Sequence, residues 1–533
     1  MSAVATSGGS RYDCVVIGGG HNGLACAAYL ARSGRSVCVV EAAEEVGGAA
    51  VTREFAPGFR VSACAHLLNA MSSRVFHDLQ LERHGLSLAA THMPTTALSG
   101  DGAALILTGN AVHALQDSAC SAADRAAYPA YAGRLNRFAR ALNPVLESVP
   151  PRLGTDSWQD RRALLRLGWQ IRRLGRSPMR ELLRVGGMCI YDLLRDNFTS
   201  PLLQGALAFD AVLGTNLGPR SPGSVFTLLY RLAAATADAD RYGGGLAQPS
   251  GGLGAVSLAL ARAAQAAGAL IRTGATVQQI LVRDDRAAGV VLTSGEGIEA
   301  DAVISNADPK STFLKLLGAE HLDAGFVRRV SHLRTQGLAA KLHLALEERP
   351  VFPGLPPEAL GGRLLLTPSM DYLERAFNHS KYREVSGSPA LEITVPTVND
   401  PSLAPEGRHV LSAVVQYAPY TLDAGWSSER QRFTDRIIDL LESCAPGLRR
   451  CVRAAQLLAP PDLEREFRIT GGHWHHIDLA LDQFFMVRPV PGAAQYRTPL
   501  QGLYLCGAGC HPGGGVMGAA GRNAARQVLA QAA

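Results

Sequence analysis

Long apolar runs are missing from this sequence. No uninterrupted apolar stretch reaches the roughly 18 residues that a membrane-spanning helix requires. The first residues, up to Arg11, are small and polar, and they lack the basic region and apolar core of a secretory signal. We therefore expect a cytoplasmic protein that is either free or peripheral to a membrane.

Cysteine motifs are missing as well. The chain has 10 cysteines, but no two are spaced as Cys-x-x-Cys, and the nearest approach is Cys506 with Cys510. This absence argues against a disulfide scaffold, a thioredoxin-like redox centre and a zinc ribbon. A reducing compartment fits this cysteine usage best.

Charge is scarce and nearly balanced. Charged residues make up 18% of the chain, and 52 basic against 46 acidic residues give a net charge of +6. That balance predicts no nucleic-acid partner. Lysine is rare, since it occurs only at Lys310, Lys315, Lys341 and Lys381, and Lys341 alone stands in an apolar strand pattern.

The composition that remains indicates a large folded protein. The chain has 533 residues, of which 47% are apolar, and its mean hydropathy is +0.06. These values exclude intrinsic disorder, and the length exceeds what one hydrophobic core usually organises. We expect at least two domains.

A β-α-β pattern begins the folded chain. An apolar run at 14–17 stops at Gly-Gly-Gly-His-Asn-Gly, a helical pattern follows until Gly34, and a second apolar run covers 37–40. Together these features make a Gly-x-Gly-x-x-Gly fingerprint placed between a strand and a helix, which is typical of dinucleotide binding.

Each residue type in the fingerprint has a physical task. Gly18 permits the tight turn, Gly20 lets the backbone approach a pyrophosphate, and Gly23 allows close packing of helix on strand. Glu41 follows Gly18 at nearly the expected spacing of about 20 residues and can accept a bond from a ribose hydroxyl. We count Asn22, inside the motif, among the cofactor-binding residues.

A glycine pair, Gly47 and Gly48, follows the acidic residue. On this feature the chain resembles the flavoprotein family that includes amine oxidases and phytoene desaturases, whose FAD fingerprint continues into such a pair. The resemblance implies that the dinucleotide is FAD rather than NAD. It also implies that the segment from Gly251 to Pro309 returns to the FAD domain, with Val277 meeting the adenine through its backbone.

The C-terminal segment extends the resemblance. A strand pattern runs into a glycine turn, and a second glycine cluster opens a final helix through Gln527. The segment is similar to the flavin motif of the desaturases, which implies that the flavin is contacted by Gly507, Ala508, Gly509, Gly514, Gly515 and Val516. Cys510 stands where that family commonly has threonine, so covalent flavin attachment and simple replacement of a small side chain both stay open.

The stretch 482–492, with 497–499, narrows the resemblance. It is similar to the branch that holds the pyridine nucleotide-disulfide oxidoreductase domain-containing proteins and bacterial phytoene desaturase-like proteins, and it extends the resemblance over nearly the whole chain. Despite that name, no redox cysteine pair is present, and the glycines at 243–245 do not follow an apolar strand. We therefore do not predict NAD(P)H as a partner.

The predicted fold class is α/β, with a Rossmann-type FAD-binding domain assembled from separated segments and an α+β substrate domain of mixed sheet plus helices. The FAD-binding domain is assigned to 1–90, 241–330 and 471–533. The helical part of the substrate domain is assigned to 91–240, and its sheet-containing part to 331–470.

Two residues are predicted to be catalytic. Lys341 alternates on a strand with leucines, and its position resembles that of the amine oxidase lysine that holds water near flavin N5; a lysine reaching solvent from a half-exposed strand is the alternative. His476 directly precedes the flavin motif and is predicted to transfer a proton or position substrate, with His66 and His511 as weaker candidates. His473 and His475 have no acidic or cysteine cluster beside them, so no metal is predicted.

The segment from Trp158 to Leu174 is amphipathic and rich in arginine. Such a helix suits a membrane interface, where arginines meet anionic lipid and the apolar face enters the acyl boundary. Packing on its own domain or on another subunit explains the pattern equally well, so both alternatives remain.

These observations predict an FAD-dependent oxidoreductase. The resemblance implies an apolar, polyene or lipid-like substrate that is dehydrogenated or isomerised, with hydride transfer to flavin N5 and oxygen or a quinone as electron acceptor. An amine oxidase assisted by Lys341 and a non-catalytic FAD-binding scaffold are the alternatives.

Overall fold

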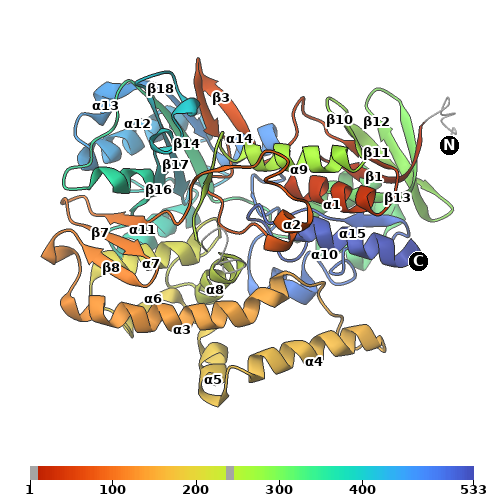
Figure 1. Cartoon of the computed structure of the whole chain (residues 1–533), viewed down its shortest axis with the longest axis horizontal. Helices are drawn as coiled ribbons and strands as arrows, with labels where there is room; N and C mark the ends of the chain where they lie inside the picture. The colour runs from red at the N-terminus through yellow and green to blue at the C-terminus, as the bar shows by residue number, and fades with distance from the viewer. Residues whose placement is uncertain (1–9, 236–244, 533) are drawn as a thin grey trace.

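The computed structural model describes residues 10–235 and 245–532, which form two lobes (Figure 1). Both ends of the chain lie in the first lobe, on the right of Figure 1. The polar lead-in predicted before Arg11 and two of the glycines at 243–245 lie outside the described residues.

The first lobe is built on a seven-stranded sheet with the order β10-β2-β1-β13-β12-β11, in which β19 also pairs with β13. The pairs β10–β2, β2–β1, β1–β13 and β13–β19 are parallel, whereas β12 runs antiparallel to both of its neighbours. This arrangement confirms a Rossmann-type domain assembled from separated segments. The strands are β1 Arg11–Ile17, β2 Val37–Val40, β10 Leu270–Arg272, β11 Val277–Arg283, β12 Arg286–Leu292, β13 Gly297–Ser305 and β19 Leu503–Leu505.

Three helices pack together beside this sheet: α1 (His21–Arg32), α9 (Gly254–Ala266) and α15 (Ala519–Ala532). At Gly521, an added Cβ would lie 2.0 Å from the carbonyl oxygen of Asn22, so only glycine lets α15 approach α1 this closely. Since both residues belong to the first turns of their helices, the contact brings two helix N-termini to one edge of the sheet.

The second lobe contains an eight-stranded sheet with the order β18-β14-β17-β16-β15-β6-β7-β8, antiparallel except where β15 pairs with β6. Helix α12 (Trp426–Cys444) packs on one face, and α3 (Ala122–Leu146), α7 (Pro201–Val212) and α8 (Ser224–Ala235) pack on the other. A mixed sheet plus helices was expected here. The strands are β6 Thr95–Leu98, β7 Ala104–Thr108, β8 Ala111–Ala114, β14 Ala339–Leu346, β15 Arg363–Leu366, β16 Ala390–Thr394, β17 His409–Gln416 and β18 Val452–Leu458.

Smaller elements complete both lobes. Two strand pairs lie apart from the main sheets: β3 Thr52–Ala56 with β4 Phe59–Ser62, and β5 Leu88–Ala90 with β9 Gln248–Pro249. The other α-helices are α2 Ser73–Asp78, α4 Trp158–Arg172, α5 Arg176–Val185, α6 Ile190–Arg195, α10 Ala324–Ser331, α11 Met370–Lys381, α13 Leu448–Cys451 and α14 Pro460–Phe467.

One part of the second lobe differs from the sequence expectation. The segment 91–240 was expected to be helical, yet it begins with β6, β7 and β8 before α3 starts. These strands are short, and pairing with β15 from the distant segment 331–470 orders them, which local pattern does not reveal. Along the described residues, no helix combines the length and the apolar character needed to cross a bilayer.

Candidate functional site

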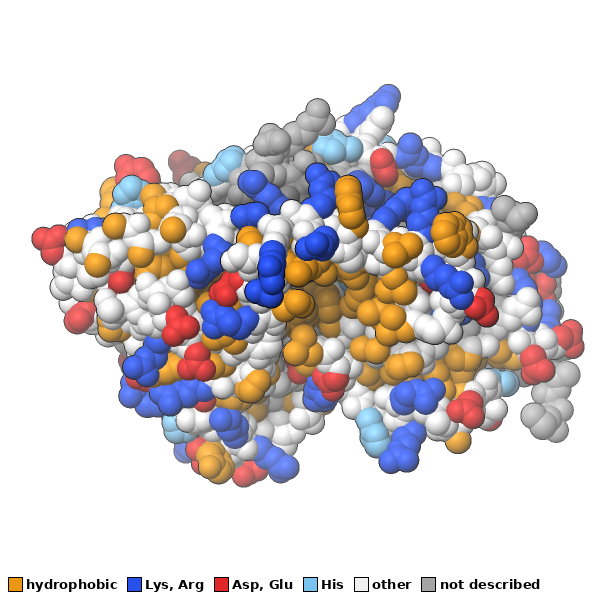
Figure 2. Space-filling model, turned by 90° about the horizontal axis from the view of Figure 1, so that it is seen from below, with side chains coloured by type: hydrophobic (Ala, Val, Ile, Leu, Met, Phe, Trp, Pro, Cys, Tyr) orange, Lys and Arg blue, Asp and Glu red, His pale blue; other side chains and the backbone are white. Residues whose placement is uncertain are grey.

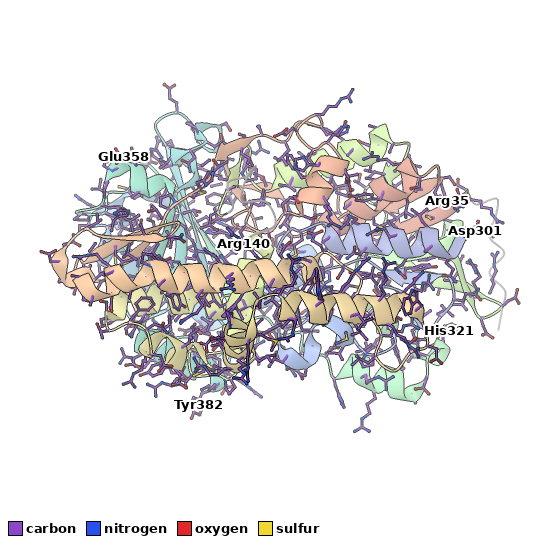
Figure 3. All side chains as sticks on the ribbon, turned by 60° about the horizontal axis from the view of Figure 1, so that its bottom comes forward. Arg35, Arg140, Asp301, His321, Glu358 and Tyr382 are labelled. Carbon is purple, nitrogen blue, oxygen red and sulfur yellow. The ribbon has the colours of Figure 1, made fainter. Side chains whose placement is uncertain are left out.

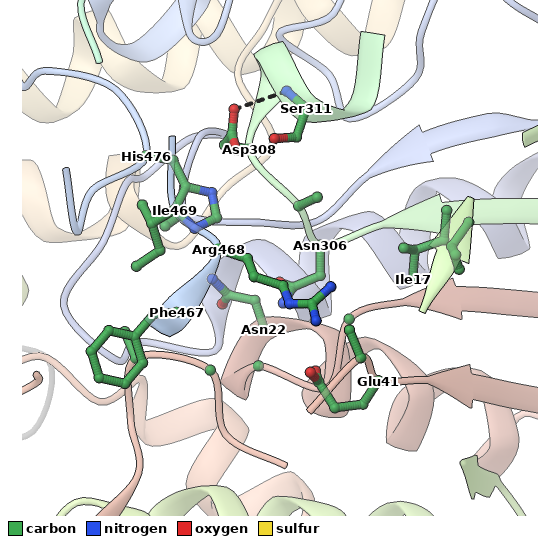
Figure 4. Close-up of a pocket in the computed structure, with 18 of the residues that line it drawn as sticks. Ile17, Asn22, Glu41, Asn306, Asp308, Ser311, Phe467, Arg468, Ile469 and His476 are labelled. Atoms are coloured by element: carbon green, nitrogen blue, oxygen red, sulfur yellow. Dashed lines mark hydrogen bonds between the residues drawn. The ribbon is translucent and has the colours of Figure 1, made fainter. Parts of the chain in front are cut away.

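A cavity of about 280 Å³, here called the sheet-edge cleft, lies where β1, β2 and β13 end (Figure 4). Parallel α/β sheets bind their ligands beyond the carboxyl ends of their strands. The cleft lies at that place although its walls come from segments far apart in the chain. The predicted cofactor residues that line it are Gly18, Gly20, Asn22, Glu41, Gly47, Gly48, Val277 and Ala508.

Two fingerprint glycines are required by close approach. A Cβ at Gly23 would lie 2.2 Å from the carbonyl oxygen of Gly18, and a Cβ at Gly20 would lie 2.7 Å from Nδ2 of Asn306. Gly23 therefore sets the packing of α1 on β1 without lining the cleft, as its sequence position predicts. Because Gly20 has no side chain, the floor of the cleft between α1 and β13 is formed there by backbone.

The start of α1 is open toward an anion. Its N-cap is Gly20, and no side chain caps its free N–H groups. Glu41, at the end of β2, is fixed beside it: its carboxylate accepts the N–H of Gly19 at 2.6 Å and that of Ala43 at 2.8 Å. Arg468 reaches into the cleft beside Asn306 (Figure 4). A helix N-terminus with a nearby guanidinium suits a pyrophosphate.

A second cavity, the inner cavity of about 130 Å³, adjoins the cleft and shares His21, Ala49 and Trp474 with it. The C-terminal glycine motif forms part of its wall through Gly515 and Val516.

The other motif glycines serve close packing around these spaces. An added Cβ would lie 2.6 Å from the Asn306 carbonyl at Gly507, 2.6 Å from Pro309 at Gly509 and 2.4 Å from His475 Nδ1 at Gly514. Ala508 lines the cleft and Gly515 and Val516 line the inner cavity, whereas Gly507, Gly509 and Gly514 line neither.

Buried polar atoms along the cleft and the inner cavity are left without partners. His21 Nε2, Asn22 Oδ1, His66 Nε2, His475 Nδ1 and His476 Nδ1 have no hydrogen-bond partner within the described chain. Buried polar atoms are normally satisfied, so a polar ligand running through the cleft and the inner cavity would supply what they lack. The residues therefore fit FAD, held by the fingerprint and by the C-terminal motif.

Lys341 is fully buried, which contradicts the alternative of a lysine reaching solvent. Its Nζ lies 2.6 Å from Nδ1 of His66 and donates to Oγ of Ser412 at 3.2 Å. Burial lowers the pKa of Lys341 to about 8. Burial, and then the charge of Lys341, hold the pKa of His66 well below its usual value. At neutral pH the proton therefore stays on Lys341, which donates to a neutral His66.

Lys341 reaches the inner cavity only through His66. The sheet register places Lys341 opposite Val414 and Val414 opposite Glu392, and the last two line the cavity while Lys341 lies one strand behind. Since Nδ1 of His66 accepts from Lys341, its Nε2 carries the ring proton and lacks a partner in the described chain. His66, a weaker candidate from the sequence, is the histidine that Lys341 polarises.

A chain of hydrogen bonds fixes the direction of donation behind Lys341. The carbonyl of Ala63 can only accept, so His343 Nε2, 3.2 Å away, carries a proton and donates to it. Nδ1 of His343 must then accept from the Ser412 hydroxyl at 3.1 Å, which leaves Oγ of Ser412 to accept from Lys341. The chain of bonds thus suits an ammonium that donates.

His476 lines the sheet-edge cleft and not the inner cavity, so the structure does not bring it together with Lys341. Burial lowers its pKa to about 4, and it is neutral near pH 7. This placement favours contact with the cofactor, while its neighbour His475 lines the inner cavity. His473 lies 3.7 Å from Asp478, and no three His, Cys, Asp or Glu side chains of the described residues are grouped to hold a metal.

Cys510 and His511 lie away from the cavities. The Cys510 thiol is buried, lines neither the cleft nor the inner cavity, and burial raises its pKa to about 12. Such a thiol is a poor nucleophile, which favours replacement of a small side chain over flavin attachment. His511 lies 2.8 Å from the carbonyl of Val145 and packs in the core.

Arg488 ties the flavin motif to the loop that carries His473, His475 and His476. The side chain is fully buried, and burial lowers its pKa to about 10. Its guanidinium donates to six backbone carbonyls, those of His475, Ile477, Asp478, Gln483, Ala508 and Cys510. One side chain therefore fixes Ala508, which lines the cleft, relative to the loop of His475, which lines the inner cavity.

A third space, the outer cavity of about 490 Å³, adjoins the inner cavity at Asn69 and Arg231. Arg231 stands at this junction with a side chain that is 22% exposed and pairs with Asp210 at 3.2 Å and Glu392 at 3.8 Å. Arg363, buried behind it, pairs with both carboxylates. Apolar side chains form most of the outer cavity, among them Met93, Leu107, Tyr128, Tyr131, Leu135, Leu207, Leu228, Leu232 and Leu246.

Sequence reasoning missed several residues of these cavities. His21 occupies a variable position of the fingerprint. The motif could have pointed to it, but sequence reasoning considered chiefly the glycines of the fingerprint. Trp474 stood between histidines that invited a metal interpretation. No local pattern marks Arg231 or Glu392, which come from distant segments and pair with each other. Arg488 lies in the stretch 482–492, and its backbone partners are near it in the chain.

Comparison with known proteins agrees with this geometry. Residues 23–529 match the family model for flavin containing amine oxidoreductases. The chain is 38% identical to the mouse pyridine nucleotide-disulfide oxidoreductase domain-containing protein 2, with 97% of this chain and 93% of the mouse protein covered.

Two further relatives are named for enzymes. One component of the limonene dehydrogenase of Castellaniella defragrans is 26% identical, with 97% of this chain and 94% of that protein covered. The lycopene-forming phytoene desaturase of Pseudescherichia vulneris is 28% identical, with 72% of each covered. The chain belongs to the flavin-containing amine oxidoreductase family and is an FAD-dependent oxidoreductase.

Proposed function

We propose that this flavoenzyme acts on an apolar substrate of the polyene or lipid-like class, by dehydrogenation or redox-assisted isomerisation. The observation that carries the proposal is the outer cavity, which is mostly apolar, larger than the inner cavity and joined to it. An apolar chain held there would gain by leaving water. FAD, when bound, supplies the ring whose N5 accepts a hydride.

The relatives support the same reaction type. One is named for dehydrogenation of limonene and another for desaturation of phytoene, and both molecules are hydrocarbons. Their reactions remove hydrogen from carbon, which matches the mostly apolar lining of the outer cavity.

The charges around the inner cavity disfavour an amine substrate. Glu392 is the one carboxylate residue among the described residues that line it, and it already pairs with Arg231 and Arg363. Lys341 adds a further positive charge one strand behind. A protonated amine would meet more positive than negative charge, so binding it would cost Coulomb energy.

A dehydrogenation removes a hydride and a proton from the substrate, and we assign the removal of the proton to His66. While Lys341 is charged, His66 Nε2 carries a proton and cannot accept another. When Lys341 loses its proton, at a pKa of about 8, its amine can accept a hydrogen bond from Nδ1–H of His66, and Nε2 is then a base facing the cavity. Flavin reduction should therefore accelerate as pH rises through about 8, and the Lys341→Met variant should lose this acceleration.

The test follows the oxidised-flavin band of the holoenzyme without oxygen. We expect bleaching by a polyene or monoterpene hydrocarbon in detergent micelles, and none by primary amines or polyamines. Leu135→Trp, which fills the outer cavity, should slow bleaching at least about tenfold by blocking apolar contact. Leu270→Trp, at an exposed position on β10, is the matched control and should leave the rate unchanged.

Other outcomes would decide against the proposal. Bleaching by amines alone would establish an amine oxidase, in which Lys341 would assist reoxidation by oxygen. Tight FAD with no bleaching by any class would favour a scaffold. After bleaching, admitting oxygen or a soluble quinone identifies the electron acceptor.

A further inference from the structure

Helices α4 and α5 form an arm that extends beneath α3, away from both sheets (Figures 1 and 3). No residue of α4 is buried. Helices of globular proteins normally bury one face, so an arm of this kind needs an explanation outside the chain's own core. It also lies on a different surface from the cavities, and its role is independent of the proposed substrate.

The arm carries an exposed apolar stripe. Trp158, Leu165 and Trp169 are 69%, 67% and 59% exposed, and their spacing of seven and four residues puts them on one side of α4. The opposite side, with Leu164, Leu167 and Ile171, is half-buried. Contact with the rest of the chain therefore uses the other face and leaves this stripe uncovered.

Arginines flank the stripe on both sides. Arg162, Arg166 and Arg172 of α4 are exposed, and none has a carboxylate within ion-pair distance in the described chain. Arg173 lies over the Trp169 ring at 4.6 Å. The exposed face of α4 thus combines aromatic and aliphatic side chains with unpaired positive charge. Figure 2 shows this side of the molecule, where hydrophobic and basic side chains alternate around a hollow.

A groove of about 1010 Å³ between α3 and α5 extends the positive charge. Five arginines line it: Arg134, Arg137, Arg176, Arg180 and Arg184. Arg137 is used to donate to the carbonyl of Leu174 at 2.6 Å, and Arg184 pairs with Glu181. Arg176 and Arg180 have no carboxylate partner among the described residues, so the groove retains charge that an anion can neutralise.

We propose that the arm docks on an anionic phospholipid bilayer. Trp158, Leu165 and Trp169 enter the interface, and the flanking and groove arginines bind lipid phosphates. Indole rings favour the headgroup region of a bilayer. An amphipathic helix with an apolar stripe flanked by arginines lies in the plane of the membrane interface. A second copy of this chain is the weaker occupant, because a two-fold contact would set the flanking arginines of the two copies against each other.

The test measures co-flotation of the FAD-loaded protein with vesicles. Vesicles of phosphatidylcholine alone are compared with vesicles of phosphatidylcholine mixed with phosphatidylglycerol. We expect at least about tenfold stronger binding to the anionic vesicles, weakened by salt. The double variants W158E/W169E and R176E/R180E should each lower binding to anionic vesicles at least about tenfold.

Matched controls separate docking from general charge effects. Val351→Glu changes an exposed apolar residue away from the arm, and Arg60→Glu changes an exposed arginine on β4; neither should alter binding. Flavin content reports folding of every variant. No binding to either vesicle, or binding unchanged in W158E/W169E, would overturn the proposal. A dimer in solution that W158E/W169E dissociates would also overturn it and assign the stripe to a second copy.

Discussion

The sheet-edge cleft and the inner cavity adjoin each other but are built differently. The floor of the cleft, at the ends of β1 and β2, comes from one short stretch that includes Gly18, Gly20 and Glu41, although its other walls come from distant segments. The inner cavity is formed by side chains such as His66, Glu392 and Trp474, which come from distant segments. The difference shows that the residues at the floor of the cofactor site are close together in the sequence. The residues that line the inner cavity are instead brought together by tertiary contacts between distant segments.

The largest expected effect comes from the junction between the two regions. Arg488→Met keeps much of the side-chain volume but removes the donors to six buried carbonyls. We expect the free energy of unfolding to fall by about 3–5 kcal/mol, since the carbonyls would lose their partners. Urea unfolding followed by circular dichroism measures the loss, and flavin content should fall with it.

Arg283→Met is the control for a surface arginine. Arg283 pairs with Glu299, and its side chain is 52% exposed. Loss of such a pair costs about 1 kcal/mol or less. Equal losses for the two variants would show that Arg488 does not tie the loop of His475 to the segment of Ala508.

A change at the start of α1, beside the cleft, should come next in size. Gly23→Ala places a Cβ 2.2 Å from the Gly18 carbonyl and forces α1 away from β1. We expect the dissociation constant of FAD to rise about 100-fold, equal to about 2.7 kcal/mol. Titration of the apoprotein with FAD measures the change.

Gly133→Ala, on α3, tests whether any new methyl group has this effect. No atom lies within 4 Å of the added Cβ, so FAD affinity should stay unchanged. Unchanged affinity in Gly23→Ala as well would contradict the backbone character of the cleft.

The residues at the floor of the cleft could be located from the sequence for a physical reason. Turns and helix starts depend on nearby residues, so Gly18, Gly20, Gly23 and Glu41 lie where their spacing indicates. The strand carrying Lys341 was also predictable, because alternation of leucines reflects a sheet with one apolar face.

The inner cavity was less accessible to sequence reasoning. The partner of Lys341, His66, lies 275 residues away along the chain, and no periodic pattern joins them. His476 was preferred over His475 by proximity to the motif, yet a positive φ of 65° at His476 and the turn around it direct the two side chains into different spaces. Which of two adjacent histidines faces a cavity depends on such backbone detail.

A pH-dependent prediction tests the inner region. Burial lowers the pKa of Lys341 to about 8 from its ordinary value of 10.5, so between these values the unfolded chain binds a proton that the folded chain has released. Stability therefore rises with pH in this window, and the penalty is fully present below pH 8. Relative to Lys341→Met, the wild type should gain roughly 2 kcal/mol of unfolding free energy between pH 7 and pH 9.5.

Lys381→Met provides the control for this measurement. Lys381 is exposed on α11. Its removal should leave the pH dependence as in the wild type. If Lys341→Met also followed the wild type between pH 7 and pH 9.5, the lowered pKa of buried Lys341 would be refuted.

The smallest effect is expected at Val277. This residue tests whether the cleft binds FAD through its backbone, in contrast to the side chains that form the inner cavity. This residue begins β11, lines the cleft and is half-buried, and its predicted contact with the adenine is made by its backbone. Val277→Ala keeps that backbone and removes little buried apolar area, so FAD affinity should change less than about threefold. Val277→Pro removes the N–H and should weaken FAD binding much more. A loss of FAD affinity in Val277→Ala as large as in Gly23→Ala would mean that the cleft also depends on side chains. The cleft would then differ from the inner cavity only in how far apart its residues lie in the sequence.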